Sequence, residues 1–150
     1  MANEEYYRQR IEELENEGKQ QDSNYSNPDI ESTTSEIRAT IQEIKKERSR
    51  IKPAATEKAR AISNFKSKKA ITVLKLKNRL ITEMTDKDTG EIVEIPPLPA
   101  TVITDIAEGI CWYELLQKEE SDAMYKAIIA TLESIRAELN GLQSISKHLE

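Results

Sequence analysis

The chain has 150 residues, of which 37% are hydrophobic and 33% are charged, and its formal net charge is −5 at pH 7. This length suits one domain of ordinary size, and a composition dominated by Ala, Ile, Leu, Glu and Lys favours long amphipathic helices over a sheet sandwich. No apolar run approaches the roughly 18 to 20 residues of a membrane-spanning helix, which argues against an integral membrane protein. The single cysteine cannot form an internal disulfide, and the first residues lack the apolar core of a signal peptide, so we expect a cytoplasmic protein.

The first 32 residues predict a separate amino-terminal region. Asn3 to Lys19 has a weakly apolar helical pattern that ends near Gly18, which predicts a short helix. Residues 20–32, QQDSNYSNPDIES, are small, polar and turn-forming, so we expect an exposed linker with little fixed structure. Together these segments predict a mobile arm before a helical domain that covers residues 33–150.

A first long helix is predicted to begin at Thr33, because Thr33 and Glu36 form a capping box. Isoleucines then recur on one face, as in a coiled-coil seam, with a charged gap at Arg48. These isoleucines are Ile37, Ile41, Ile44 and Ile51. Pro53 next ends this helix or begins another in nearly the same direction.

Residues 54–84 predict a second long helix of about eight turns, with one apolar face and one basic face. The large side chains of the apolar arc are Ile62, Phe65, Val73, Leu76, Leu80 and Met84. The opposite side carries a ridge of four cations, Arg60, Lys68, Lys75 and Arg79. Three more lysines, Lys66, Lys69 and Lys77, lie near or within the apolar arc, where their methylene stems can cover the seam.

The helical pattern breaks between residues 85 and 99. Asp88-Thr89-Gly90 favours a turn, and residues 91–95 alternate as a short extended piece. This piece suits one half of a β-hairpin, although no partner strand is evident.

Residues 100–117 return to helical spacing, and Gly109 weakens the middle of this helix and predicts a bend there. Trp112 and Tyr113 combine a large apolar area with polar tips, so we expect both at the packed junction between helices.

Residues 121–149 have the most regular helical pattern in the chain. Its apolar positions alternate in steps of three and four residues, with a polar interruption at Ser146. They are Met124, Ile128, Leu132, Ile135, Leu139, Leu142 and Leu149. We expect this helix to pack against the basic helix, antiparallel if the intervening segment folds back, with Asp122, Glu133 and Glu138 either complementing or repelling the cations according to the register.

These patterns predict an all-α protein that forms a long helical hairpin, or coiled-coil-like bundle, with a mobile amino-terminal arm. The apolar seams exceed what one thin hairpin can bury, so we also predict self-association.

Motifs for catalysis or metal binding are weak. Asp88-Thr89-Gly90 matches the tripeptide of aspartic proteases, but it follows a long helix instead of lying among strands, and it lacks the other ligands of a calcium loop. The only histidine, His148, suits a helix carboxyl end, and the only cysteine, Cys111, suits a small buried position. There is no Gly-rich phosphate loop. We therefore predict no enzymatic activity, no cofactor and no metal site.

Positive charge is concentrated between Lys45 and Arg79, where thirteen Lys and Arg residues face only Glu47 and Glu57. Three interpretations stay open. The cations can be a solvated face paired with acidic residues of this chain or of a neighbouring subunit. They can bind a phosphate backbone, with release of counterions. They can also dock on an acidic protein or a membrane surface.

In the carboxyl-terminal third, Tyr125-Lys126-Ala127 and the later run LESIRAELNGLQSISKHLE resemble the last helix of small bacteriophage-encoded helical proteins. They resemble more loosely that of UvsY-type recombination mediators, and the preceding basic segment is similar in character. The resemblance covers residues 33 onward, and residues 85–99 and the acidic amino-terminal helix depart from it. It implies a closed homo-oligomer that binds single-stranded DNA and helps to load a recombinase.

We therefore predict a phage-type accessory nucleic-acid-binding protein of the host cytoplasm, which acts in recombination or replication as a homo-oligomer. Its expected partners are single-stranded DNA or another polyanion, together with a recombinase or another protein, and no membrane. The expected nucleic-acid contacts are Arg60, Lys66, Lys68, Lys69, Lys75, Lys77 and Arg79. The alternative is a structural or interaction protein, such as a virion component or a host-factor inhibitor, whose basic helix docks on acidic protein.

Overall fold

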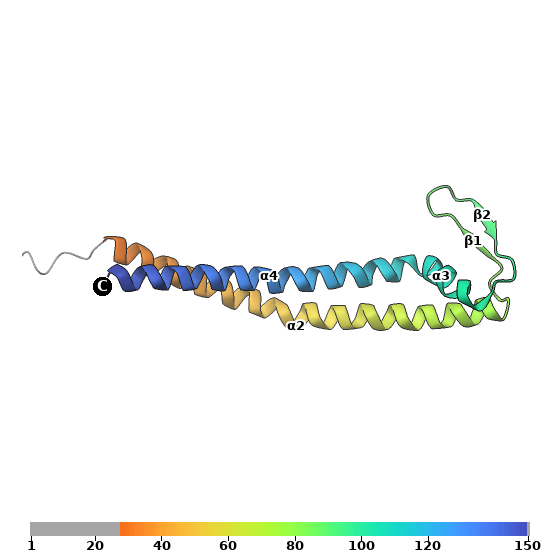
Figure 1. The fold of residues 1–150 in the computed structure, drawn as a ribbon, viewed down its shortest axis with the longest axis horizontal. Helices are drawn as coiled ribbons and strands as arrows, with labels where there is room; N and C mark the ends of the chain where they lie inside the picture. Colours follow the sequence, from red (N-terminus) through yellow and green to blue (C-terminus); the bar gives the residue numbers. More distant parts are fainter. Residues whose placement is uncertain (1–27, 150) are drawn as a thin grey trace, which may run out of the picture. The chain divides into compact units, whose positions relative to one another are not determined.

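The computed structural model describes residues 28–149 and confirms the all-α class. The predicted helix at residues 3–19, the start of the linker and the mobile arm lie outside the described residues. The elements, in chain order, are α2 (Pro28–Lys77), β1 (Glu83–Thr85), β2 (Ile92–Glu94), α3 (Ala100–Ile110) and α4 (Trp112–Leu149) (Figure 1).

Helix α2 begins at Pro28, earlier than the predicted start at Thr33. A proline is tolerated in the first turn because its missing N–H has no partner there, and Asp29 and Glu31 place negative charge at the positive end of the helix dipole. Thr33 is not the cap, since its hydroxyl donates to the Asp29 carbonyl at 2.7 Å inside the helix. The last part of the predicted linker is therefore helical.

Helix α2 continues through Pro53, which neither ends it nor starts another helix. A proline inside a helix removes one backbone donor and crowds the preceding turn. Partly or fully buried positions nevertheless recur at helical spacing on both sides of it, at Ile51, Ala54, Lys58 and Ala61. The continuing packing of this face offsets the local cost.

Helix α2 ends at Lys77 and does not reach Met84 as predicted. The backbone turns at Arg79, whose φ of 56° is left-handed. Two residues of the predicted apolar arc therefore leave the helix: Leu80 is 73% exposed, and Met84 lies on β1.

Strands β1 and β2 pair antiparallel, so the predicted extended piece finds its partner in residues 83–85, of which Glu83 and Met84 belong to the predicted helix. The turn between them holds the predicted Asp88-Thr89-Gly90, with Gly90 at a φ of 74°. The carboxylate of Asp86 accepts hydrogen bonds from the backbone N–H groups of Asp88, at 2.8 Å, and Thr89, at 3.1 Å. These bonds, that of Asp88 first, hold the pKa of Asp86 below its usual value.

The chain forms two compact units, which are described separately. The first, in its described part, contains residues 28–42 of α2 and residues 137–149 of α4. Its buried position on α2 is Thr40, whose hydroxyl donates to the Glu36 carbonyl at 2.9 Å, while Ile41 is only partly buried.

The second unit, residues 43–136, contains the rest of α2, the β-hairpin, α3 and the start of α4. Contacts across it pair rising numbers on α2 with falling numbers on the later helices, for example Lys58 with Asp122 and Thr72 with Cys111. This confirms the antiparallel packing. A core cluster joins the end of α2 to the residue after β2 and to α3 through Leu76, Ile95, Ile103 and Ala107.

The junction between α3 and α4 differs from the prediction. The helix breaks at Cys111, not at Gly109, and α4 then continues without interruption from Trp112. Cys111 is fully buried, as predicted, and its Sγ lies 3.3 Å from the Thr72 hydroxyl. Trp112 and Tyr113 were expected in this junction but are 41% and 53% exposed, because the small cysteine occupies the inward position beside α2.

Candidate polyanion-binding surface

Five of the thirteen cations between Lys45 and Arg79 form ion pairs. The pairs are Arg50 with Glu47, Lys58 with Asp122, Arg60 with Glu57, Lys68 with Glu114 and Lys69 with Glu108. Two of these pairs lie within α2, and the other three join α2 to α3 or α4. Acidic residues of the chain therefore neutralise part of the basic segment.

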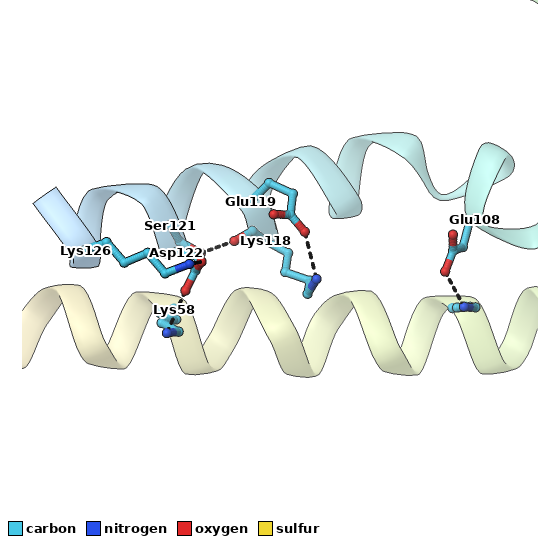
Figure 2. Close-up of polar contacts among 8 residues, drawn as sticks. Lys58, Glu108, Lys118, Glu119, Ser121, Asp122 and Lys126 are labelled. Atoms are coloured by element: carbon cyan, nitrogen blue, oxygen red, sulfur yellow. Dashed lines mark hydrogen bonds and ion pairs between the residues drawn. The ribbon is translucent and has the colours of Figure 1, made fainter.

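The best-connected of these pairs is centred on Asp122. Its carboxylate lies between the ammonium groups of Lys58, at 2.6 Å, and Lys126, at 2.7 Å (Figure 2). The hydrogen bond from Lys126 and then that from Lys58 lower the pKa of Asp122 to about 2, and the same contact raises the pKa of Lys126. Lys58 also lies 4.9 Å from the centre of the Tyr125 ring, a cation–π distance. This lysine thus serves the packing of α2 against α4.

Lys69 is also engaged within the fold. Its side chain is 24% exposed, it pairs with Glu108 of α3, and its ammonium lies 5.8 Å from the centre of the Phe65 ring. Lys68 is held more weakly, since it is 55% exposed and lies 3.5 Å from Glu114.

The predicted ridge of Arg60, Lys68, Lys75 and Arg79 loses its last member, because α2 ends before Arg79. Arg60 pairs within α2 and Lys68 turns toward α4, whereas Lys75 is exposed on α2. Arg79 lies beyond the end of the helix, where its Nη1 donates to the Ile95 carbonyl at 2.8 Å. The ridge assumed a helix that continued through residue 84, and the earlier end of α2 removes Arg79 from it.

A different set of cations shares one side of α2. With 3.6 residues per turn, five exposed cations lie within an arc of about 60°. They are Lys45, Arg48, Lys52, Lys66 and Lys77, and we call them the basic stripe. None of them forms an ion pair with residues 28–149.

The remaining positions of this arc favour a close approach by a ligand. Between Lys52 and Lys77 the same arc carries the exposed small residues Ala59, Ser63 and Ala70. No Asp or Glu of residues 44–77 lies in it, because Glu47 and Glu57 project from other sides of the helix. The arc therefore carries no negative charge from α2 and is sterically open.

Sequence reasoning found only Lys66 and Lys77 of this stripe, and missed Lys45, Arg48 and Lys52. The missed residues precede Pro53, and a proline in a helical pattern usually marks a boundary. A signal was present in their spacing, since Lys45, Lys52 and Lys66 are separated by multiples of seven residues, which returns a side chain to nearly the same side of a helix.

Comparisons with protein-family models, with curated proteins and with solved structures found no match to this chain. Within residues 28–149, no three or more His, Cys, Asp or Glu side chains are grouped so as to hold a metal ion. No helix of this part of the chain combines the length and apolar character needed to cross a membrane.

Proposed function

We propose that the protein is an accessory nucleic-acid-binding protein that contacts the phosphate backbone through the basic stripe of α2. The observation that carries this proposal is the stripe itself, five exposed cations on one side of a continuous helix with no carboxylate of α2 in their arc. A phosphate backbone is the regularly charged polyanion that such a linear array suits, and counterion release drives the association.

The stripe is long enough to contact several phosphates. From Lys45 to Lys77 a helix rises about 48 Å at about 1.5 Å per residue. Cations that contact phosphates position the strand but do not read its sequence, so binding is weakly sequence-specific. The resemblance of the carboxyl-terminal third to UvsY-type mediators favours single-stranded DNA and a role in recombination or replication.

The protein acts as a homo-oligomer in this proposal. Large apolar side chains are exposed on α2 and on α4, among them Leu74, Tyr113, Leu116 and Met124, whose exposed fractions lie between 45% and 59%. Association of copies would remove this apolar area from water. Static light scattering at micromolar concentration is expected to show a mass that is a multiple of 17.1 kDa; a monomer would contradict this part of the proposal.

The binding proposal is tested by fluorescence anisotropy with labelled single-stranded and double-stranded oligonucleotides of equal length at low and moderate salt. We expect salt-sensitive binding, tighter for the single strand, that weakens when the stripe is neutralised. Absence of binding at low salt would refute the proposal. A pull-down from nuclease-treated extract tests the alternative function. A basic helix that docks on acidic protein would retain that partner without nucleic acid.

A further inference from the structure

A pocket of about 230 Å³ lies at the end of α2, where the basic stripe ends. Its apolar lining includes Leu76 of α2, Ile95 after β2 and Ile103 of α3, which are 5%, 5% and 7% exposed. These three side chains belong to the main core cluster of the second unit. Well-packed side chains of this kind hold a preformed surface, which spares a ligand the cost of ordering it.

The rim of the pocket combines two prolines with two cations. Pro96 and Pro97 follow β2 and are exposed, as are Lys77 and Arg79 at the end of α2. No acidic residue lines the pocket. A lining in which apolar side chains meet a positive edge suits a ligand that has a flat apolar part and an attached anionic group.

Arg79 is held at this rim by the way α2 ends. The N–H of Leu80 donates to the Lys75 carbonyl at 2.8 Å, and the N–H of Arg79 donates to the Leu76 carbonyl at 3.1 Å. This is the Schellman pattern, in which the residue in the left-handed conformation is usually Gly. An arginine with a φ of 56° is uncommon there, and one of its terminal nitrogens donates to the Ile95 carbonyl while further guanidinium donors remain.

The pocket continues the basic stripe, because Lys77 is both the last cation of the stripe and part of the pocket lining. A strand whose phosphates follow the stripe would therefore present its next nucleotide at the pocket. We propose that the pocket takes one base of the bound strand, while Lys77 and Arg79 contact the phosphate of that nucleotide. This inference rests on the proposed function, and it adds a base-binding site to a surface that otherwise contacts only the backbone.

The size and chemistry of the pocket favour a single base over other anionic ligands. Pockets for drug-sized ligands span about 300 to 1,000 Å³, so this smaller pocket suits one ring system. Inorganic phosphate would gain nothing from the apolar side chains of the lining. Every base has a flat face that can contact apolar surfaces, so the pocket would hold a strand of any sequence.

Methyl NMR of the full-length protein with labelled Ile and Leu tests this inference directly. We expect thymidine monophosphate to shift the methyl signals of Leu76, Ile95 and Ile103 in a saturable way, and inorganic phosphate at equal concentration to leave them in place. If these methyl signals do not respond to the nucleotide, the inference is wrong, even where oligonucleotides bind with the salt dependence expected of the stripe. That last result would leave the proposed function intact.

Variants of Arg79 separate the phosphate contact from a structural role. Arg79→Gly suits the left-handed backbone and removes the guanidinium, whereas Arg79→Lys keeps the charge. We expect Arg79→Gly to weaken the binding of thymidine monophosphate about tenfold, in line with the loss of one charge-assisted contact. Arg79→Lys should weaken this binding less. Arg60→Gln, which alters a cation remote from the pocket, is the control and should have no effect. Equal affinity of Arg79→Gly and the unaltered protein would overturn the assigned contact.

A second measurement compares oligothymidylate with an abasic strand that has the same number of phosphates. Burial of one base against the apolar side chains of the pocket adds to the affinity, so the abasic strand should bind at least about threefold more weakly. Because the stripe recognises phosphates alone, equal affinity of the two strands would show that only the stripe is used, and the base-binding pocket would be refuted.

Discussion

Neutralising the three cations of the basic stripe that precede Pro53 gives the sharpest test of the proposed function. The variant replaces Lys45, Arg48 and Lys52 with Gln, which keeps a good helix former at each position. A matched control replaces Arg50, Arg60 and Lys68 with Gln and removes the same number of charges from the same helix. The two variants have equal net charge and differ only in whether the lost cations lie on the stripe or in ion pairs.

The expected magnitude follows from the number of phosphate contacts. For single strands the logarithm of affinity falls with the logarithm of salt by about 0.7 per contact, so five stripe cations predict a slope of about −3.5, and the two left in the variant predict about −1.4. Between about 50 and 200 mM salt, this corresponds to about a hundredfold loss of affinity for the unaltered stripe and about a sevenfold loss for the variant. The control should keep a slope near that of the unaltered protein.

The assay is fluorescence anisotropy of a labelled single strand at a series of salt concentrations, with circular dichroism to show that each variant keeps its helix content. A similar decrease in slope for the stripe variant and the control would show that total charge, not the stripe, governs binding. The stripe would then lose its assigned role.

Three further predictions concern the stability of the fold. Pro53→Ala should raise the free energy of unfolding by about 2 kcal/mol, because the penalty of about 3 kcal/mol for an interior proline exceeds its restriction of the unfolded chain by about 1 kcal/mol; urea titration measures this, and a loss of stability would contradict a continuous α2. Ile128 is 3% exposed, so Ile128→Ala should lower the same free energy by about 2 to 5 kcal/mol, and an unchanged urea midpoint would argue against its burial. Asp122 has its pKa lowered to about 2 in the folded protein from an ordinary value near 3.8, so its contribution is present above about pH 4 and is lost as the pH falls toward 2. Thermal unfolding of Asp122→Asn should therefore depend less on pH in this window than that of the unaltered protein, and identical pH profiles would refute this.

Much of the candidate surface was visible in the sequence as an excess of charge, but its assignment to residues was not. Lys58 and Lys69 contribute to the same excess of positive charge as Lys52 and Lys66. Yet Lys58 and Lys69 pair with carboxylates of α4 and α3. Which lysine meets a carboxylate depends on the register of one helix against another. A single sequence does not contain that register, because each periodic face allows several.

The sequence by itself determined the features that depend on local interactions. Helical periodicity placed most of the long helices, turn chemistry placed the Asp88-Thr89-Gly90 turn, and the small size of Cys111 predicted its burial. These features follow from side chains and backbone groups close together along the chain.

Only the tertiary structure decided how the basic segment is divided. Packing on both sides of Pro53 keeps α2 continuous and brings Lys45, Arg48 and Lys52 into line with Lys66. At the other end, the core that joins α2 to residues after β2 favours a helix end at Lys77, which moves Arg79 to a pocket rim. Both outcomes depend on burial against segments distant in sequence, whose contribution exceeds the local preferences of a proline within a helix and of an arginine in a left-handed conformation.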